Sequence, residues 1–433
     1  MNRSRKDIFV IGFALFSMFF GAGNVIFPPY LGLSCGREWF LGFACYYMAD
    51  IGLALVALFA VLHSGSPEHM TRRIGKVPST LLLSAIILCI GPMLAIPRTA
   101  ATTYEMSIVP LVSGVSPVLF AFLFFAVIML LCLRESAVVD IVGKVLTPLL
   151  LICLLVLIVK GVIDPIGPVP DRVLVDNVPV TGIEAGYQTM DVLAAVIFGI
   201  IILKSAQDKG YTEQKDQVKV VAGAGLVAGA ALLIVYLGLT YLGVTTSRFF
   251  DLSVLRTFLV TAIVRNLMGD FGIVLFAIVV ALACVTTAVA LVSCAASYFS
   301  KLSGGKLRYT WLVVAICLFS AVAANLGLDT IVSIAAPILN IIYPPTLVLV
   351  FLSFFDRRIA SDWVFRFAAL GALLYSILET AVSTFGLSVP FLASMPFASL
   401  SMGWIVPAAI CGLIGALCGR HFPQVSEQCL DLE

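Results

Sequence analysis

The hydrophobic positions of this chain occur in long, nearly uninterrupted runs, separated by short polar or Pro/Gly-rich segments. Most runs approach or exceed the ~20 residues that an α-helix needs to cross a bilayer. Strands of a membrane barrel would be shorter and would alternate between apolar and polar residues. The pattern predicts an all-α membrane protein of about twelve transmembrane helices. The expected spans are 8–34, 39–62, 79–106, 118–133, 138–162, 187–203, 218–244, 271–299, 309–326, 331–355, 363–387 and 400–418.

Composition adds the surrounding solvent to this picture. Hydrophobic residues make up 61% of the 433 positions and charged residues 12%, whereas soluble globular chains are about 45–50% apolar and about 25% charged. The chain cannot cover itself with polar surface, so we expect a lipid bilayer around it. The net charge of +2 gives no sign of a nucleic-acid partner. The 11 cysteines form no C-x-x-C pair and are interpreted as small apolar residues.

Lysine and arginine set the expected orientation. When the N-terminus is placed inside and the spans are threaded alternately, 19 of these residues fall inside and 6 outside, and Arg98 stays in the membrane, which accounts for all 26. This bias follows the positive-inside rule and predicts that both termini are cytoplasmic. The first apolar run continues without a clear cleavage site, so we interpret it as a retained helix rather than a signal peptide. The two longest outer loops are expected at 163–186 and 245–270.

The first helix contains the strongest local motif, in which Gly21 and Gly23 flank Ala22 and precede Asn24. Two glycines so close together favour an unwound stretch in mid-membrane. Unwinding frees N–H groups that bind an anion such as a carboxylate, and carbonyls that coordinate a cation. The alternative is a close packing seam with a proline kink. Asn24 either ligates an ion or bridges helices.

A second interruption is expected in the sixth helix, where Gly199 follows Phe198. An interrupted helix at the start of each half is typical of transporters built from inverted repeats. Phe198 is a candidate lining residue of an apolar pocket and Gly199 a point of close approach, although ordinary packing explains both. Asp191 is expected about one turn from the outer surface. It is a candidate coupling or gate residue, or simply a charge that complements a helix dipole.

Two further charges, Arg98 and Glu105, lie seven residues apart on one face of the third helix. A charge inside the membrane is costly, so both are candidate coupling or gate residues. The alternative for Arg98 is a structural role, in which it snorkels or caps nearby carbonyls.

Thr286 and Thr287 are adjacent hydroxyls near the middle of the eighth helix. Such oxygens can ligate a hard cation, although a threonine in a membrane helix usually bonds its own i−4 carbonyl. The G-x-S-x-G sequence at 32–36 lacks a histidine on the same side of the membrane, so it cannot form a hydrolase triad. We do not expect an enzyme.

Several motifs, in order along nearly the whole chain, resemble the bacterial branched-chain amino acid:cation symporter family. They lie at Phe20–Pro29, Gly91–Ala100, Thr189–Asp191, Asn325–Leu328 and Ile342–Pro345. The resemblance implies inward transport of leucine, isoleucine and valine across the inner membrane, driven by a sodium or proton gradient and without a cofactor. It also implies the LeuT-like fold. In a single domain, 1–433, the first repeat would span 1–162, the inverted repeat 187–355, and two additional helices 363–418.

The resemblance also implies site residues. The first-helix glycine segment would hold the substrate carboxylate, and the sixth helix would line the substrate pocket. The threonine pair would ligate sodium together with backbone carbonyls of the first helix. The implied substrate residues are Gly21, Ala22, Gly23, Asn24, Phe198 and Gly199, and a second ion site is left open for Asn24. The implied sodium residues are Thr286 and Thr287, with backbone carbonyls of Ser17 and Phe20.

The leading hypothesis is therefore a sodium-coupled importer of branched-chain amino acids. Proton coupling, with Glu105 or Asp191 as the carrier, is the first alternative. A membrane receptor that binds amino acids without transporting them is the alternative from another class. A channel is disfavoured because no filter sequence is present. The sequence predicts neither the preferred substrate nor the oligomeric state.

Overall fold

The computed structural model describes residues 3–112, 114–133, 137–387 and 389–421. These residues form α-helices joined by short 3₁₀ and π-helical segments, without a β-strand among them, so the all-α prediction is confirmed. The helices are α1 (Arg3–Phe19), α2 (Ala22–Cys35), α3 (Trp39–Tyr47), α4 (Leu53–Ser64), α5 (Pro67–Thr71), α6 (Lys76–Leu88), α7 (Ala95–Thr103), α8 (Pro117–Leu133), α9 (Ala137–Ile163), α10 (Val178–Thr189), α11 (Asp191–Asp208), α12 (Gln214–Val244), α13 (Arg256–Leu302), α14 (Tyr309–Ala323), α15 (Leu328–Ser353), α16 (Asp362–Thr384), α17 (Pro390–Ala393) and α18 (Ile405–His421).

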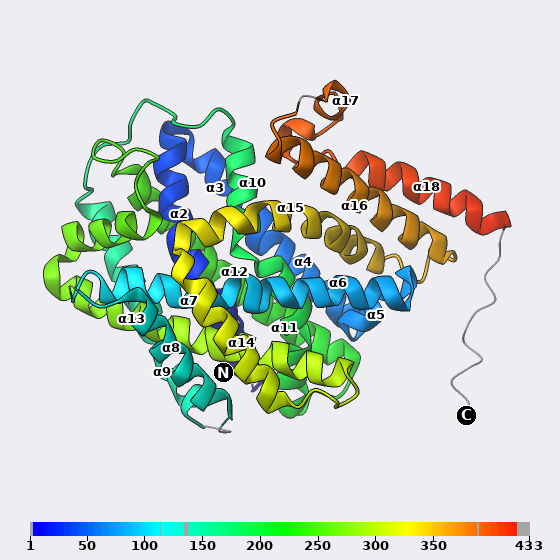
Figure 1. The fold of residues 1–433 in the computed structure, drawn as a ribbon, viewed down its shortest axis with the longest axis horizontal. Helices are drawn as coiled ribbons and strands as arrows, with labels where there is room; N and C mark the ends of the chain where they lie inside the picture. Colours follow the sequence, from blue (N-terminus) through cyan, green and yellow to red (C-terminus); the bar gives the residue numbers. More distant parts are fainter. Residues whose placement is uncertain (1–2, 113, 134–136, 388, 422–433) are drawn as a thin grey trace.

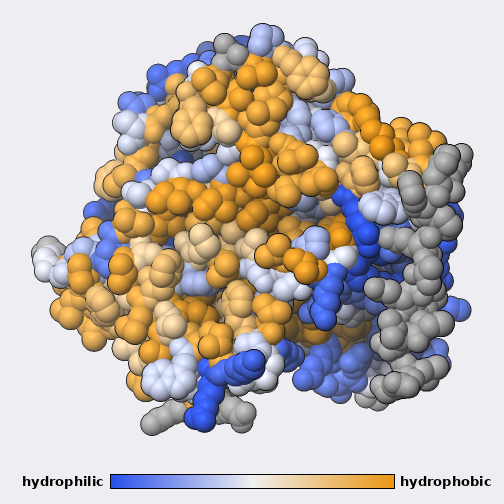
Figure 2. Space-filling model, turned by 45° about the vertical axis from the view of Figure 1, so that its right-hand side comes forward, coloured by the Kyte–Doolittle hydropathy of each residue, from blue (hydrophilic) through white to orange (hydrophobic). Residues whose placement is uncertain are grey.

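Length and hydropathy mark this bundle as membrane-spanning. Within the described residues, eight helical segments are long and apolar enough to cross a bilayer, and three shorter helices are also apolar. Large apolar side chains such as Phe122, Phe271 and Leu413 are exposed on the outside of the protein. Figure 2 shows one such face, where apolar residues cover a broad area. Exposing so large an apolar surface to water would cost free energy, so this surface is suited to contact with lipid.

The helices form a main bundle and a smaller pair at its edge (Figure 1). In the bundle, α2 packs on α12, α3 on α10, and α4 on α11, so elements far apart in sequence surround the centre. The pair consists of α16 and α18, which pack along each other, while α16 joins the bundle through α15 and through the 3₁₀ segment Arg72–Ile74. The predicted additional helices at 363–418 correspond to this pair.

The first membrane helix is broken between α1 and α2, as its sequence predicts. Gly21 has an extended backbone, with φ −111° and ψ −170°. Its N–H group donates to Oδ1 of Asn24 at 3.3 Å, whereas a continuing helix would direct it to the carbonyl of Ser17. The helix is therefore interrupted at Phe20 and Gly21, and a new helix begins at Ala22.

The sixth membrane helix is also broken, but the predicted position at Gly199 is wrong. α10 ends where Met190 adopts a left-handed conformation with φ 67°, and α11 begins at the next residue. Gly199 lies inside the continuous helix α11. A Cβ atom there would lie 2.7 Å from Cγ1 of Val61, so Gly199 serves the close approach of α11 to α4.

Two expected outer loops are partly helical. α10 begins at Val178, within the loop expected at 163–186, and the side chain of Asn177 caps its start by accepting from the N–H of Val180. α13 begins at Arg256, within the loop expected at 245–270, and bends at Gly269, whose φ of 66° suits glycine. The additional helical residues in these two loops lie at the same end of the bundle as α2.

Candidate substrate and ion site

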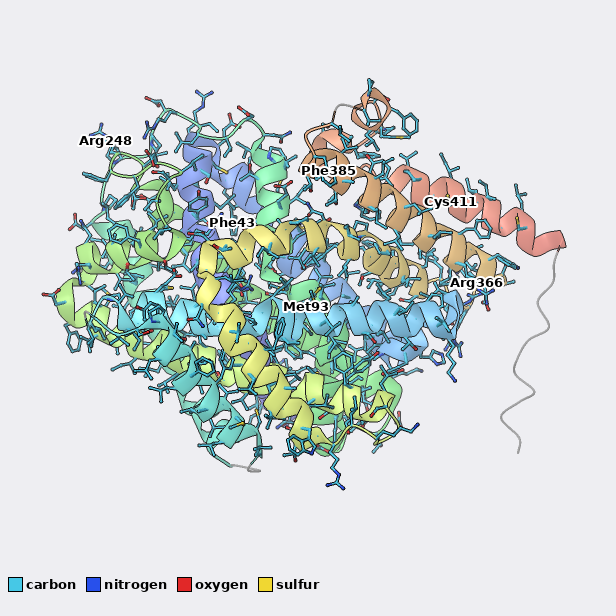
Figure 3. All side chains as sticks on the ribbon, viewed as in Figure 1. Phe43, Met93, Arg248, Arg366, Phe385 and Cys411 are labelled. Atoms are coloured by element: carbon cyan, nitrogen blue, oxygen red, sulfur yellow. The ribbon has the colours of Figure 1, made fainter. Side chains whose placement is uncertain are left out.

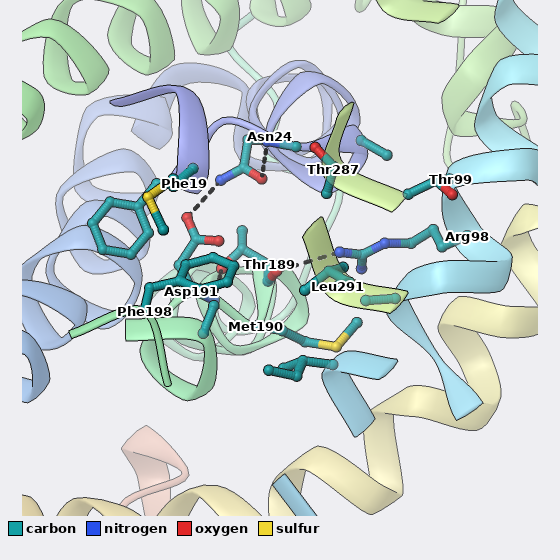
Figure 4. Close-up of a pocket in the computed structure, with 16 residues that line it drawn as sticks. Phe19, Asn24, Arg98, Thr99, Thr189, Met190, Asp191, Phe198, Thr287 and Leu291 are labelled. Atoms are coloured by element: carbon teal, nitrogen blue, oxygen red, sulfur yellow. Dashed lines mark hydrogen bonds between the residues drawn. The ribbon is translucent and has the colours of Figure 1, made fainter. Parts of the chain in front are cut away.

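The two breaks meet at a small central cavity (Figure 4). The cavity offers about 40 Å³ to the centre of a water-sized sphere, whereas one water needs about 10–15 Å³. Its lining comes from both halves of the two broken helices and from α7 and α13. Most of the lining side chains are apolar, among them Met18, Phe19, Ile90, Ala95, Met190, Ala194, Phe198 and Leu291.

Four helix ends point at this cavity. α1 and α10 end there with carbonyl groups, and α2 and α11 begin there with amide groups. The first N–H groups of a helix lack intrahelical acceptors and carry the positive end of its dipole. Gly21 and Ala22 place the start of α2 in the cavity wall. This end suits an anion such as a carboxylate, and the carbonyl ends suit a cation.

Arg98 occupies the carbonyl end of α10. Its guanidinium group donates to the carbonyl oxygens of Gln188 at 2.6 Å and Thr189 at 3.3 Å, and only 4% of the residue is exposed. It also lies over the ring of Phe27, 5.7 Å from the centroid. Arg98 thus neutralises the negative end of α10 while its side chain borders the cavity, in line with the carbonyl-capping alternative.

Asn24 joins three helices. Its Oδ1 accepts from Gly21, while its Nδ2 donates to Oδ2 of Asp191 at 2.7 Å and to the hydroxyl of Tyr236. Because a side-chain amide has two N–H hydrogens, both donors of Asn24 are in use. The residue is 1% exposed and fixes α2 relative to α11 and α12. This arrangement matches the helix-bridging interpretation.

The two glycines of the first break have different surroundings. A Cβ at Gly23 would lie 2.8 Å from Nη2 of Arg98, so this glycine makes room for the guanidinium group. A Cβ at Gly21 would meet its nearest atoms, in Asn24 and Thr287, only at 3.8 Å. Gly21 borders the cavity, and a larger side chain there would fill it.

The predicted sodium residues lie around the end of α1. Thr287 borders the cavity, whereas the hydroxyl of Thr286 donates to the carbonyl of Ala283 at 2.9 Å. The carbonyl of Ser17 is released by the turn at Gly21. The aromatic ring of Phe20 is buried against that of Phe16, which leaves its backbone as the only part suited to a cation.

Glu105 lies apart from the central cavity. Its carboxylate accepts from the hydroxyl of Thr257 at 2.7 Å and from the N–H of Leu328, the first residue of α15, at 3.0 Å. Nearby, Arg256 pairs with Asp329 and lies over the ring of Tyr30. These contacts tie the π-helical segment Tyr104–Ile108, α13, α15 and α2 together at one end of the bundle.

A second cavity lies at that end. It offers about 280 Å³ to the centre of a water-sized sphere, and its wall includes Tyr30, Gln188, Arg256, Asp329 and Asn340. Its wall combines these polar side chains with apolar ones such as Phe27 and Leu31.

Asp191 is not near the outer surface, contrary to its expected position. It is the first residue of α11, it is 5% exposed, and it borders the central cavity. Its proposed alternative role as a charge at a helix N-terminus fits the structure, but that N-terminus lies in the middle of the protein.

The sequence interpretation missed Asp50. This residue is fully buried in the π-helical segment Met48–Gly52, and its Oδ1 accepts from the hydroxyl of Thr189 at 2.7 Å. The same hydroxyl accepts from the N–H of Asp191 at 3.4 Å, so Thr189 links the two acidic residues. An acidic residue inside the apolar run 39–62 was the signal that could have identified it.

A membrane-embedded helical bundle in which two helices break at one central pocket has the architecture of a secondary transporter. The chain belongs to a family described as branched-chain amino acid transport protein, whose sequence profile matches residues 4–422. Its relatives are permeases and carriers rather than enzymes, as the sequence predicts.

Two curated relatives illustrate the family. The chain is 34% identical over 426 residues to the branched-chain amino acid permease BraB of Bacillus subtilis, covering 96% of this chain and 95% of the relative. It is 34% identical over 423 residues to the branched-chain amino acid transport system 2 carrier protein of Pseudomonas aeruginosa, covering 96% of each.

Solved structures support the fold. Mhp1, a nucleobase-cation-symport-1 family transporter in a closed conformation with bromovinylhydantoin bound, has a TM-score of 0.67 at 13% identity, over 97% of this chain and 94% of that chain. A sodium-coupled sialic acid symporter has a TM-score of 0.54 at 13% identity, over 96% of this chain and 98% of that chain. At such identities the likeness concerns the fold alone, and it confirms the predicted LeuT-like architecture.

Proposed function

We propose that this protein imports leucine, isoleucine and valine across a bacterial inner membrane by symport with sodium, with both termini in the cytoplasm. The observation that carries the proposal is the central cavity, which combines the amide end of α2 with a mostly apolar lining. A branched-chain amino acid has the complementary features, a carboxylate and an aliphatic side chain. The names of the two relatives support this choice of substrate.

In this proposal the substrate carboxylate accepts from the free N–H groups at the start of α2. The aliphatic side chain packs against Phe198, Ala194 and Leu291, which belong to the cavity wall. One methylene changes binding by only about 1–3 kcal/mol, so leucine, isoleucine and valine should compete with one another. The cavity must widen around the substrate, because its present volume suits only small molecules such as water.

Sodium would bind at the carbonyl end of α1 together with the hydroxyl of Thr287. Coupling requires that the ion and the amino acid both favour the same conformer. The shared wall provides a route for this coupling, because Gly21, at the start of α2, faces Thr287, whose Cγ2 would lie 3.8 Å from a Cβ atom there.

The test is uptake of radiolabelled leucine into proteoliposomes under an imposed sodium gradient or an imposed proton gradient. Accumulation with sodium alone is expected. Accumulation with protons alone would remove sodium from the proposal. Saturable leucine binding without accumulation under either gradient would instead identify a receptor.

A further inference from the structure

A third cavity, separate from the central one, lies where three membrane-spanning segments end. Lys76 is the first residue of one segment, Leu302 the last of another and Asp362 the first of a third, and all three line the cavity. Figure 3 shows a further lining residue, Arg366, near the start of α16. This cavity, the basic pocket, therefore lies where the hydrocarbon core of a bilayer gives way to water.

The wall of the basic pocket changes in character with depth. The pocket offers about 550 Å³ to the centre of a water-sized sphere. Along α6 it is lined by Lys76, Ser79, Thr80 and Leu83, which share one face of the helix over two turns, or about 10 Å. The wall is thus charged at the helix end, then carries hydroxyl groups, and is apolar towards the membrane interior. A phospholipid changes in the same order from its headgroup to its acyl chains.

Part of the charge at the pocket is balanced within the protein. Asp362 accepts from Nε of Arg73, which also pairs with Asp356 at 3.0 Å. Arg72 approaches the same Asp356 at 3.7 Å. These two arginines and two aspartates neutralise one another, so a ligand must be recognised by the other charged side chains.

Three positive charges remain in the wall against one negative charge. Lys76, Lys301 and Arg366 come from three different helices, α6, α13 and α16, and the negative charge is the exposed Glu68. Within the part of the chain that the structure describes, neither lysine forms an ion pair. A phosphodiester, with one negative charge and several acceptor oxygens, complements such a set of donors.

We propose that the basic pocket binds the phosphate group of an anionic phospholipid. The acyl chains extend along the outer surfaces of α6 and α16, where Leu81 is 65% exposed and Leu370 is 50% exposed. The guanidinium group of Arg366 lies over the ring of Trp363, 5.2 Å from its centroid, and tryptophan is enriched where membrane helices meet the headgroups. With both termini in the cytoplasm, as proposed above, the lipid belongs to the cytoplasmic leaflet. Its binding does not depend on the transported substrate.

The lipid connects the two parts of the protein. Lys76 and Lys301 belong to helices of the main bundle, whereas Arg366 belongs to the pair formed by α16 and α18. One phosphate between these side chains offsets their mutual repulsion and attracts all three. Because a ligand of the folded state stabilises it, the bound lipid should raise the unfolding temperature.

The first experiment adds lipids to the delipidated full-length protein in detergent, and native mass spectrometry and thermal unfolding are the measurements. Phosphatidylglycerol should bind about tenfold more tightly than phosphatidylcholine, whose ammonium group cancels the phosphate charge, and should raise the unfolding temperature more. Equal binding of both lipids would overturn the inference. Inorganic phosphate that displaces phosphatidylglycerol at equal concentration would also overturn it, because the site would then belong to a soluble anion.

Variants then locate the lipid. Lys76→Gln combined with Lys301→Gln should weaken phosphatidylglycerol binding about tenfold and leave phosphatidylcholine binding unchanged. The matched control combines Lys219→Gln with Lys306→Gln, which removes two charges from exposed positions outside the pocket. Equal losses in the two double variants would show that net charge, and not this pocket, attracts the lipid. Unchanged phosphatidylglycerol binding in the pocket variant would likewise overturn the inference.

A further measurement needs no variant and therefore does not depend on how a variant folds. Phosphatidylglycerol with a photoreactive acyl chain is bound to the wild-type protein and cross-linked, and the labelled peptides are identified by mass spectrometry. We expect labels within residues 76–88 and 362–374. Labels confined to other segments would place the lipid elsewhere and overturn the assignment of the basic pocket.

Discussion

Single residues around the first helix break have separable tasks. Gly23 accommodates Arg98, while Gly21 borders the cavity and has free space around its Cβ position. The same short motif therefore contains one position that is essential for packing and another that is open to substitution. This difference could not be inferred from the sequence, because it depends on which neighbouring helix each glycine faces.

Gly21→Val should abolish leucine uptake while the protein still folds. The new side chain would occupy the cavity, and the nearest atoms to its Cβ lie at 3.8 Å. Gly412→Ala is the control, because it adds a methyl group in ordinary contact, at 3.4 Å from Ala368, on a helix far from the cavity. Uptake by membrane vesicles and size-exclusion profiles are the measurements. Normal uptake by Gly21→Val would contradict the proposed substrate position.

Thr287→Val should raise the sodium concentration needed for half-maximal uptake about tenfold, equivalent to ~1.4 kcal/mol. The change removes the hydroxyl and keeps the shape of the side chain. Thr286→Val should have a much smaller effect, because its hydroxyl already donates to Ala283. Equal losses in both variants would show that the pair ligates sodium jointly. An unchanged sodium response in Thr287→Val would remove this helix from the ion site.

At the scale of helices, the sequence predicts where the apolar runs lie but not every place where a helix breaks. The break at Gly21 is predicted because glycine is conformationally free. The break at Met190 could not be predicted, since methionine has no preference for a left-handed conformation and tertiary contacts impose it. Asp191 and Asp50 were misplaced or missed for a related reason, because their meeting depends on the packing of α10 against α3 and the segment that follows it.

Glu105 acts between helices, and its neutral variant should reveal a structural role. Glu105→Gln retains an acceptor for Leu328 but removes the charge from the start of α15, which should cost about 0.3–1 kcal/mol. We expect a slightly lower thermal unfolding temperature in detergent and unchanged leucine uptake driven by a sodium gradient. Loss of leucine uptake at normal stability would restore Glu105 as a candidate coupling residue.

At the scale of the whole molecule, ion pairs tie helices together at two ends of the bundle. Arg256 pairs with Asp329 at the end where α2 terminates, and Lys209 pairs with Asp7 at 3.2 Å at the end where α1 begins. Alternating access requires these ends to open in turn. Each ion pair would then break once in every transport cycle.

Reversing the charges of the first pair tests this role. Arg256→Asp alone should reduce leucine uptake strongly, because two carboxylates would face each other. Adding Asp329→Arg should restore a substantial part of the uptake rate, since the attraction returns with exchanged partners. Uptake in proteoliposomes is the measurement, and the single variants serve as controls. A double variant no better than either single one would show that the contact is not a gate.

The left-handed turn at Met190 has a consequence for how the protein is made. A lone segment 178–208 has no local reason to break, and Asp191 near its centre would oppose membrane insertion by about 2.5–3.5 kcal/mol. The partners that stabilise the break, Asn24, Asp50 and Arg98, all belong to helices that leave the ribosome earlier. Biogenesis should therefore depend on the order of synthesis, and a chain with its two halves exchanged should insert this segment poorly.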